Sequence, residues 1–93
     1  MRSIFLGYLL LSCLFVQAQT VTYETAKKKA QVSFDNAILA IRDYNDSAAV
    51  GYLQDALRIE PNFADAYGQL GITYVTMKKY KDAIASFEKL KQL

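Results

Sequence analysis

The most informative stretch of the sequence lies between Tyr67 and Phe87 and reads YGQLGITYVTMKKYKDAIASF. Its first part carries Leu70 and Gly71 between two tyrosines, and its second part carries Ala83 four residues before Phe87. Apolar residues recur at three- and four-residue spacing on both sides of a lysine-rich turn. This spacing predicts two amphipathic helices that pack against each other as a hairpin.

The same pattern occurs once more, about 34 residues earlier in the chain. Ala49 corresponds to Ala83, and the turn at residues 44–46 corresponds to the turn at residues 78–80. A repeat of this period predicts a second helical hairpin that precedes the first one.

Turn residues and apolar spacing together place four helices, at residues 22–43, 46–59, 63–77 and 81–93. Pro61 separates the second helix from the third, because a residue before proline is pushed out of the helical conformation. No segment alternates apolar and polar residues with a period of two, so no strand is predicted. The expected fold class is all-α.

The motif Tyr-x-x-Leu-Gly-x-x-Tyr at residues 67–74, followed by Ala-x-x-x-Phe at residues 83–87, resembles the tetratricopeptide repeat family. Pro61 matches the proline that closes such a repeat. The resemblance implies antiparallel helical hairpins of an α-solenoid with about two repeats. A degenerate repeat would span residues 30–63, and a repeat lacking its end would span residues 64–93.

The resemblance also implies which residues hold the paired helices together. Gly71 and Ala83 would face each other, because small residues let two backbones approach closely. The full set of expected packing residues is Tyr67, Leu70, Gly71, Tyr74, Ala83, Phe87, Ala49, Ala56 and Pro61.

The first expected helix departs from the family pattern. Ser33, Asn36 and Ala40 stand where the later repeat has aromatic and aliphatic residues. Residues 19–29 would extend this helix towards the N-terminus as an atypical cap, or the first repeat would pair in a slipped register. An unrelated four-helix bundle is the alternative to a repeat fold.

Members of this family use the first helix of each pair to line a groove that takes a peptide or a partner helix. Mapped onto this chain, the groove residues are Gln31, Phe34, Asp35, Ile38, Arg42, Asp65, Gln69, Ile72 and Thr76. Arg42 is the one cation among them, so a clamp for a peptide carboxylate is not expected. Alternatively, apolar members such as Phe34 and Ile38 belong to the core.

The N-terminus differs in composition from the rest of the chain. Ile4 to Val16 is an apolar run of 13 residues, which is short for a membrane span and typical of a signal peptide. We expect a signal peptide at residues 1–18, with cleavage after Ala18. Leu-Leu-Ser-Cys ending at Cys13 also resembles a lipoprotein signal, so a lipid anchor is the alternative. Either interpretation predicts export to the periplasm or cell envelope, which the resemblance suggests is bacterial.

The composition excludes several classes of chemistry. The chain has no His and a single Cys, so neither a His-based catalytic triad nor a His–Cys zinc site can form. Its formal charge of +2 is too small to indicate nucleic-acid binding. Lys27, Lys28 and Lys29 are interpreted as a solvated helix face. We therefore expect no enzyme, no cofactor and no metal site.

These expectations combine into one function and two alternatives. The chain is expected to be a non-catalytic protein–protein interaction scaffold of the bacterial cell envelope that binds another protein or a peptide. One alternative is the N-terminal part of a larger multidomain envelope protein, and the other is a structural homo-oligomer.

Overall fold

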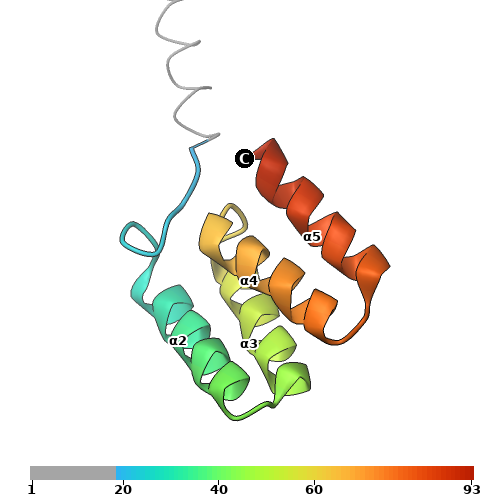
Figure 1. The fold of residues 1–93 in the computed structure, drawn as a ribbon. Helices are drawn as coiled ribbons and strands as arrows, with labels where there is room; N and C mark the ends of the chain where they lie inside the picture. Colours follow the sequence, from blue (N-terminus) through green and yellow to red (C-terminus); the bar gives the residue numbers. More distant parts are fainter. Residues whose placement is uncertain (1–18) are drawn as a thin grey trace, which may run out of the picture.

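The computed structural model describes residues 19–93. Four helices follow one another in this part of the chain (Figure 1): α2 (Lys28–Arg42), α3 (Asp46–Ile59), α4 (Ala64–Thr76) and α5 (Tyr80–Gln92). α2 pairs with α3, α4 pairs with α5, and α3 packs on α4 to join the two hairpins. The expected all-α fold of stacked helical hairpins is confirmed. The expected signal peptide and Cys13 lie outside the described residues.

The two hairpins turn in the same way, one repeat apart. Tyr44 and Lys78 both have left-handed backbones, with φ of 57° and 61°. The next residue donates its N–H back into the preceding helix at 2.8 Å in each turn, from Asn45 to Ala40 and from Lys79 to Tyr74. This is the Schellman ending of a helix. The matching turns show that the 34-residue offset is the register that relates the hairpins.

α3 begins with a side-chain cap. The Asn45 side-chain oxygen accepts the Ala48 N–H at 3.2 Å, which satisfies one of the free donors in the first helical turn. The helix therefore begins directly after Asn45, at Asp46. The Schellman turn fixes Asn45 as the capping residue, because Asn45 is the first residue after the left-handed Tyr44.

The buried core consists mainly of alanines and contains few large side chains. Leu53 and Phe63 are the largest fully buried side chains. Around them lie Ala30 and Ala37 of α2, Ala56 of α3, and Ala66 and Leu70 of α4. Small residues allow the helix backbones to lie close together, so the stability of the stack depends heavily on its few large side chains.

Residues 19–27 precede α2 as an extended segment and a turn. Val21 forms an isolated parallel β-bridge with Phe63. The Val21 N–H donates to the Asn62 carbonyl at 2.9 Å, and the Ala64 N–H donates to the Val21 carbonyl at 2.9 Å. The segment is thereby held against the corner between α3 and α4 (Figure 1).

The helix expected over residues 22–43 therefore starts later, at Lys28, and the expectation that residues 19–29 extend it was wrong for most of that range. The Thr25 hydroxyl accepts the Thr22 N–H at 3.0 Å, a local bond that competes with helix formation. β-Branched residues such as Val21 also favour extended backbone. Pairing with residues 62–64 then fixes the segment outside the helix.

Candidate functional site

The residues expected to line a groove lie on one face of α2 and one face of α4, which we call the α2–α4 face. On α4, Asp65, Ile72 and Thr76 are exposed, and Gln69 is half-buried. On α2, Asp35 and Arg42 are exposed, and Gln31, Phe34 and Ile38 are half-buried. The Phe34 ring meets the buried Phe63 ring with centroids 5.4 Å apart, so the middle of α2 lies beside the start of α4.

The end of this face near Phe34 is already occupied by the chain itself. The Gln31 amide donates to the Tyr23 carbonyl at 2.7 Å. The Tyr23 hydroxyl donates to both carboxylate oxygens of Asp35, at 3.0 and 3.1 Å. The Tyr23 ring also packs on Phe34, with centroids 5.7 Å apart. Three expected groove residues therefore hold the N-terminal segment.

The hydrogen bond to Asp35 also affects the acidity of Tyr23. It raises the pKa of the phenol above its usual 10.0, and loss of water around the group and the negative charges of Asp35 and Glu24 act in the same direction. The neutral phenol is favoured because only the protonated hydroxyl can donate to the carboxylate. The phenol therefore remains a donor at neutral pH.

The other end of the face, on α4, has apolar side chains in solvent. Ile72 is 54% exposed and Val75 is 46% exposed. The Thr76 hydroxyl donates to the Ile72 carbonyl at 3.2 Å, so this hydroxyl is engaged within its own helix. Asp65 and Gln69 lie towards the start of the same helix. This part presents a small apolar patch with polar neighbours.

The residues expected to pack the paired helices mostly lie inside. Ala49, Ala56, Leu70, Gly71 and Ala83 are buried, Tyr67 and Tyr74 are half-buried, and Phe87 and Pro61 are exposed. The Tyr67 hydroxyl donates to the Pro61 carbonyl at 3.0 Å. The three atoms nearest to a Cβ added at Gly71 all belong to the Phe87 ring.

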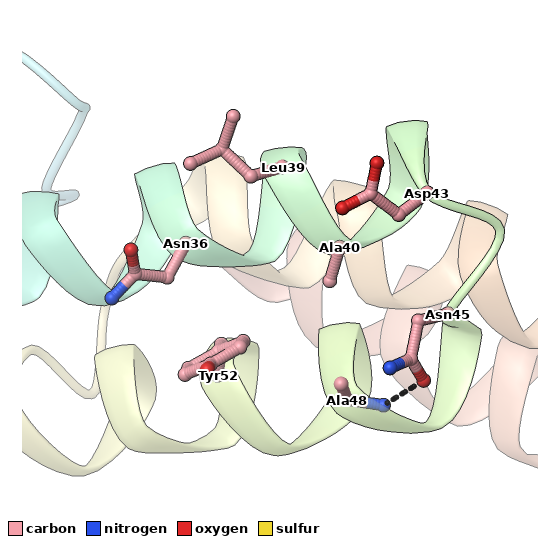
Figure 2. Close-up of a pocket in the computed structure, with 7 residues that line it drawn as sticks. All are labelled: Asn36, Leu39, Ala40, Asp43, Asn45, Ala48 and Tyr52. Atoms are coloured by element: carbon pink, nitrogen blue, oxygen red, sulfur yellow. Dashed lines mark hydrogen bonds between the residues drawn. The ribbon is translucent and has the colours of Figure 1, made fainter.

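A hollow of about 260 Å³ lies on a different face, between α2 and α3 (Figure 2). Leu39 and Asp43 line it from the α2 side and Tyr52 from α3, together with Asn36, Ala40, Asn45 and Ala48. None of these is an expected groove residue. Asp43 supplies its sole carboxylate, and no group of three or more His, Cys, Asp or Glu residues able to hold a metal occurs within residues 19–93.

Tyr23 and Phe63 are the site residues that sequence reasoning missed. Both were assigned to helices, and neither belongs to the repeat motif. The available signal was the run Val21-Thr-Tyr23, whose β-branched and aromatic residues favour extended backbone. Its partner at residues 62–64 is distant in the sequence, and no local pattern indicates that pairing.

Comparison with known proteins supports the repeat assignment for the second half of the chain. A family model described as tetratricopeptide repeat matches residues 52–85, which run from within α3 through α4 into α5. Searches of curated proteins and of solved structures found no significant match. Tetratricopeptide repeats are typically non-catalytic protein–protein interaction modules, so the match indicates a scaffold class for this segment. Among the described helices, none has the length and apolar character that a membrane crossing requires.

Proposed function

We propose that this chain is a non-catalytic scaffold of the bacterial cell envelope that binds a peptide or a partner helix on its α2–α4 face. The observation that carries the proposal is the exposure of Ile72 and Val75 on α4, the helix at the centre of the matched repeat. Exposed apolar side chains rimmed by polar groups are typical of interaction surfaces. Asp65 and Gln69 supply such polar groups on the same helix.

Peptide binding can be tested with a displayed peptide library selected against the immobilised chain. Ile72→Asp should weaken the selected peptides about tenfold or more, because it places a charge in the apolar patch. Ile84→Asp on α5 is the matched control, since Ile84 is similarly exposed, and it should leave binding unchanged. Equal loss in both variants, or loss in neither, would remove the α2–α4 face as the site.

Two polar residues provide a gentler test of the same face. Gln69→Ala and Arg42→Ala should leave the helix content unchanged and weaken the selected peptides. Side-chain truncations at half-buried and exposed positions usually alter stability little. Unchanged affinity in both variants would show that the polar rim of the face takes no part in recognition.

Export is the second part of the proposal, and it is supported by the composition of residues 1–18. The intact mass of the product in the envelope fraction of its host tests it. A mass equal to residues 19–93 supports cleavage after Ala18, and a lipid-modified mass starting at Cys13 supports an anchor. A much larger mass supports the alternative of a longer multidomain protein, and a product that keeps its uncleaved N-terminus contradicts export with processing.

Self-association is a second candidate, favoured by one contrast between the repeats. Leu53 of α3 is fully buried, whereas Phe87, one repeat later on α5, is 40% exposed, and its neighbour Ile84 is 57% exposed. The first hairpin is covered at these positions by α4. A second copy that covers α5 in the same way would bury Ile84 and Phe87.

This candidate is tested by measuring the molecular mass in solution over a concentration series. A homo-oligomer should dissociate on dilution, and its melting temperature should rise with concentration. Ile84→Asp should shift the chain to monomer, and Ile72→Asp should not. A monomer at all concentrations would exclude self-association through α5.

A further inference from the structure

One end of the α2–α4 face has the geometry of a binding site for an extended peptide. Its backbone contribution comes from the corner between α3 and α4, where the Asn62 carbonyl accepts from Val21 and the Ala64 N–H donates to Val21, both at 2.9 Å. Main-chain pairing of this kind can be made by any extended chain. The occupant in this structure is the segment of residues 19–25.

Side chains supply the selectivity that main-chain pairing lacks. Val21 lies in the paired stretch, and Tyr23 begins the turn that follows it, in which the Ala26 N–H donates to the Thr22 carbonyl at 2.9 Å. Both side chains nevertheless face the protein. Val21 packs against the buried core. Tyr23 packs on Phe34 and donates its hydroxyl to Asp35, and Gln31 donates to its carbonyl. The site therefore selects an aliphatic residue followed two positions later by tyrosine.

We propose that this site binds a peptide of a partner protein with that pattern, extended at the aliphatic residue and turning at the tyrosine, and that residues 21–23 occupy the same site in the absence of the partner. The inference rests on the proposed function, and it names the ligand for one end of the same face. The aromatic ring, the phenol donor and the backbone carbonyl of the ligand would meet Phe34, Asp35 and Gln31, respectively.

Local release of the bound segment is consistent with its contacts. The hydrogen bonds of Thr20 and Tyr23 lie in exposed surroundings, and bonds of this kind open more easily than those of a buried core. Ala26 is buried in the core, so release would involve only the residues that precede it. Because the segment is tethered, a separate peptide competes against an effective concentration in the millimolar range.

The first experiment uses the unmodified chain and a synthetic peptide with the sequence of residues 19–25. Amide hydrogen exchange is followed by NMR with and without excess peptide. The Val21 amide should lose protection, because its segment is displaced, whereas the Ala64 amide should keep its protection because the peptide carbonyl replaces that of Val21. Unchanged protection of Val21 at saturating peptide, or loss of protection at both amides, would overturn the proposal.

A variant with an emptied site gives the second measurement. Val21→Pro combined with Tyr23→Ser removes the backbone donor and the phenol of the segment and leaves the receiving residues intact. This variant should bind the labelled peptide at least about tenfold more tightly than the unmodified chain, because the tethered competitor is gone. A peptide with serine in place of tyrosine should bind about tenfold more weakly, and adding Asp35→Asn to the variant should weaken the original peptide.

The outcomes separate this inference from the proposed function. If the variant keeps its helical circular dichroism and binds neither peptide, or binds both equally, the segment is only a structural part of the fold. If it fails to fold, the exchange experiment on the unmodified chain decides. If library-selected peptides bind in an Ile72-dependent way and the 19–25 peptide does not bind, only the inference fails. If no selected peptide depends on Ile72, the proposed function fails, whatever the exchange experiment shows.

Discussion

Gly71 on α4 lies directly against the ring of Phe87 on α5. A Cβ atom added at Gly71 would lie 2.5 Å from Cζ and 2.7 Å from Cδ1 of that ring, closer than side-chain carbons approach one another. The two helices of the second hairpin are therefore spaced by a glycine on one side and an aromatic ring on the other. This contact explains why the motif has glycine at position 71, since any side chain there would collide with the Phe87 ring.

Replacing Gly71 with alanine should destabilise the protein by about 1–3 kcal/mol through overpacking, even though alanine is the better helix former. Gly51→Ala is the matched control, since Gly51 also lies within a helix and has nothing within 4 Å of an added Cβ. That change should stabilise the protein by about 0.5–1 kcal/mol. Urea unfolding measures both, and a Gly71→Ala variant as stable as Gly51→Ala would refute the contact.

Phe63 should be the most sensitive aromatic position. It is fully buried and joins the N-terminal segment, α2 and α4, so Phe63→Ala should cost about 3–5 kcal/mol. Phe87→Ala should cost less, because Phe87 is partly exposed. Unfolding free energies in the reverse order would show that the core is centred on α5 instead.

The left-handed turns predict two stabilising substitutions. Lys78→Gly and Tyr44→Gly should each stabilise the chain by about 0.5–1 kcal/mol, because glycine adopts positive φ without the steric cost of a side chain. Tyr44 is 94% exposed, so little packing is lost with its ring. Lys89→Gly, within α5, should instead destabilise by about 1 kcal/mol. Thermal melts that show the same sign for all three variants would contradict the assigned turn geometry.

The bond between Tyr23 and Asp35 predicts a dependence on alkaline pH. Because the pKa of folded Tyr23 lies above its usual 10.0, the stabilisation from this bond is complete below pH 10 and is lost as pH rises through the raised value. The difference in unfolding free energy between the unmodified chain and Tyr23→Phe should be constant below pH 10. It should shrink towards zero as the pH rises above that value. In Asp35→Asn, an NMR titration should show the Tyr23 pKa returning towards 10.0; a raised value that persists would assign the shift to another cause.

The repeated motif was sufficient to predict the two hairpins and their turns, and the tetratricopeptide repeat model that it resembles matches residues 52–85. Each of these features depends on residues within one hairpin, such as the three- and four-residue spacing around Gly71, and on the 34-residue echo between Tyr44 and Lys78. Local spacing also predicted the ends of α3 within a residue of those observed. The burial of the small motif residues could be predicted from the sequence, because small residues at this spacing are what close packing between consecutive helices requires.

Only the tertiary structure shows where the N-terminal segment lies and which residues of the α2–α4 face it covers. Val21, Tyr23 and Phe34 come together only because residues 62–64 offer a free carbonyl and a free N–H at the corner between the hairpins. That pairing joins residues about 40 positions apart in the sequence, whereas the helical spacing of Ala26 and Ala30 favoured a longer first helix. Backbone hydrogen bonds and the burial of Phe63 outweigh that tendency, since a local preference amounts to less than about 1 kcal/mol per residue.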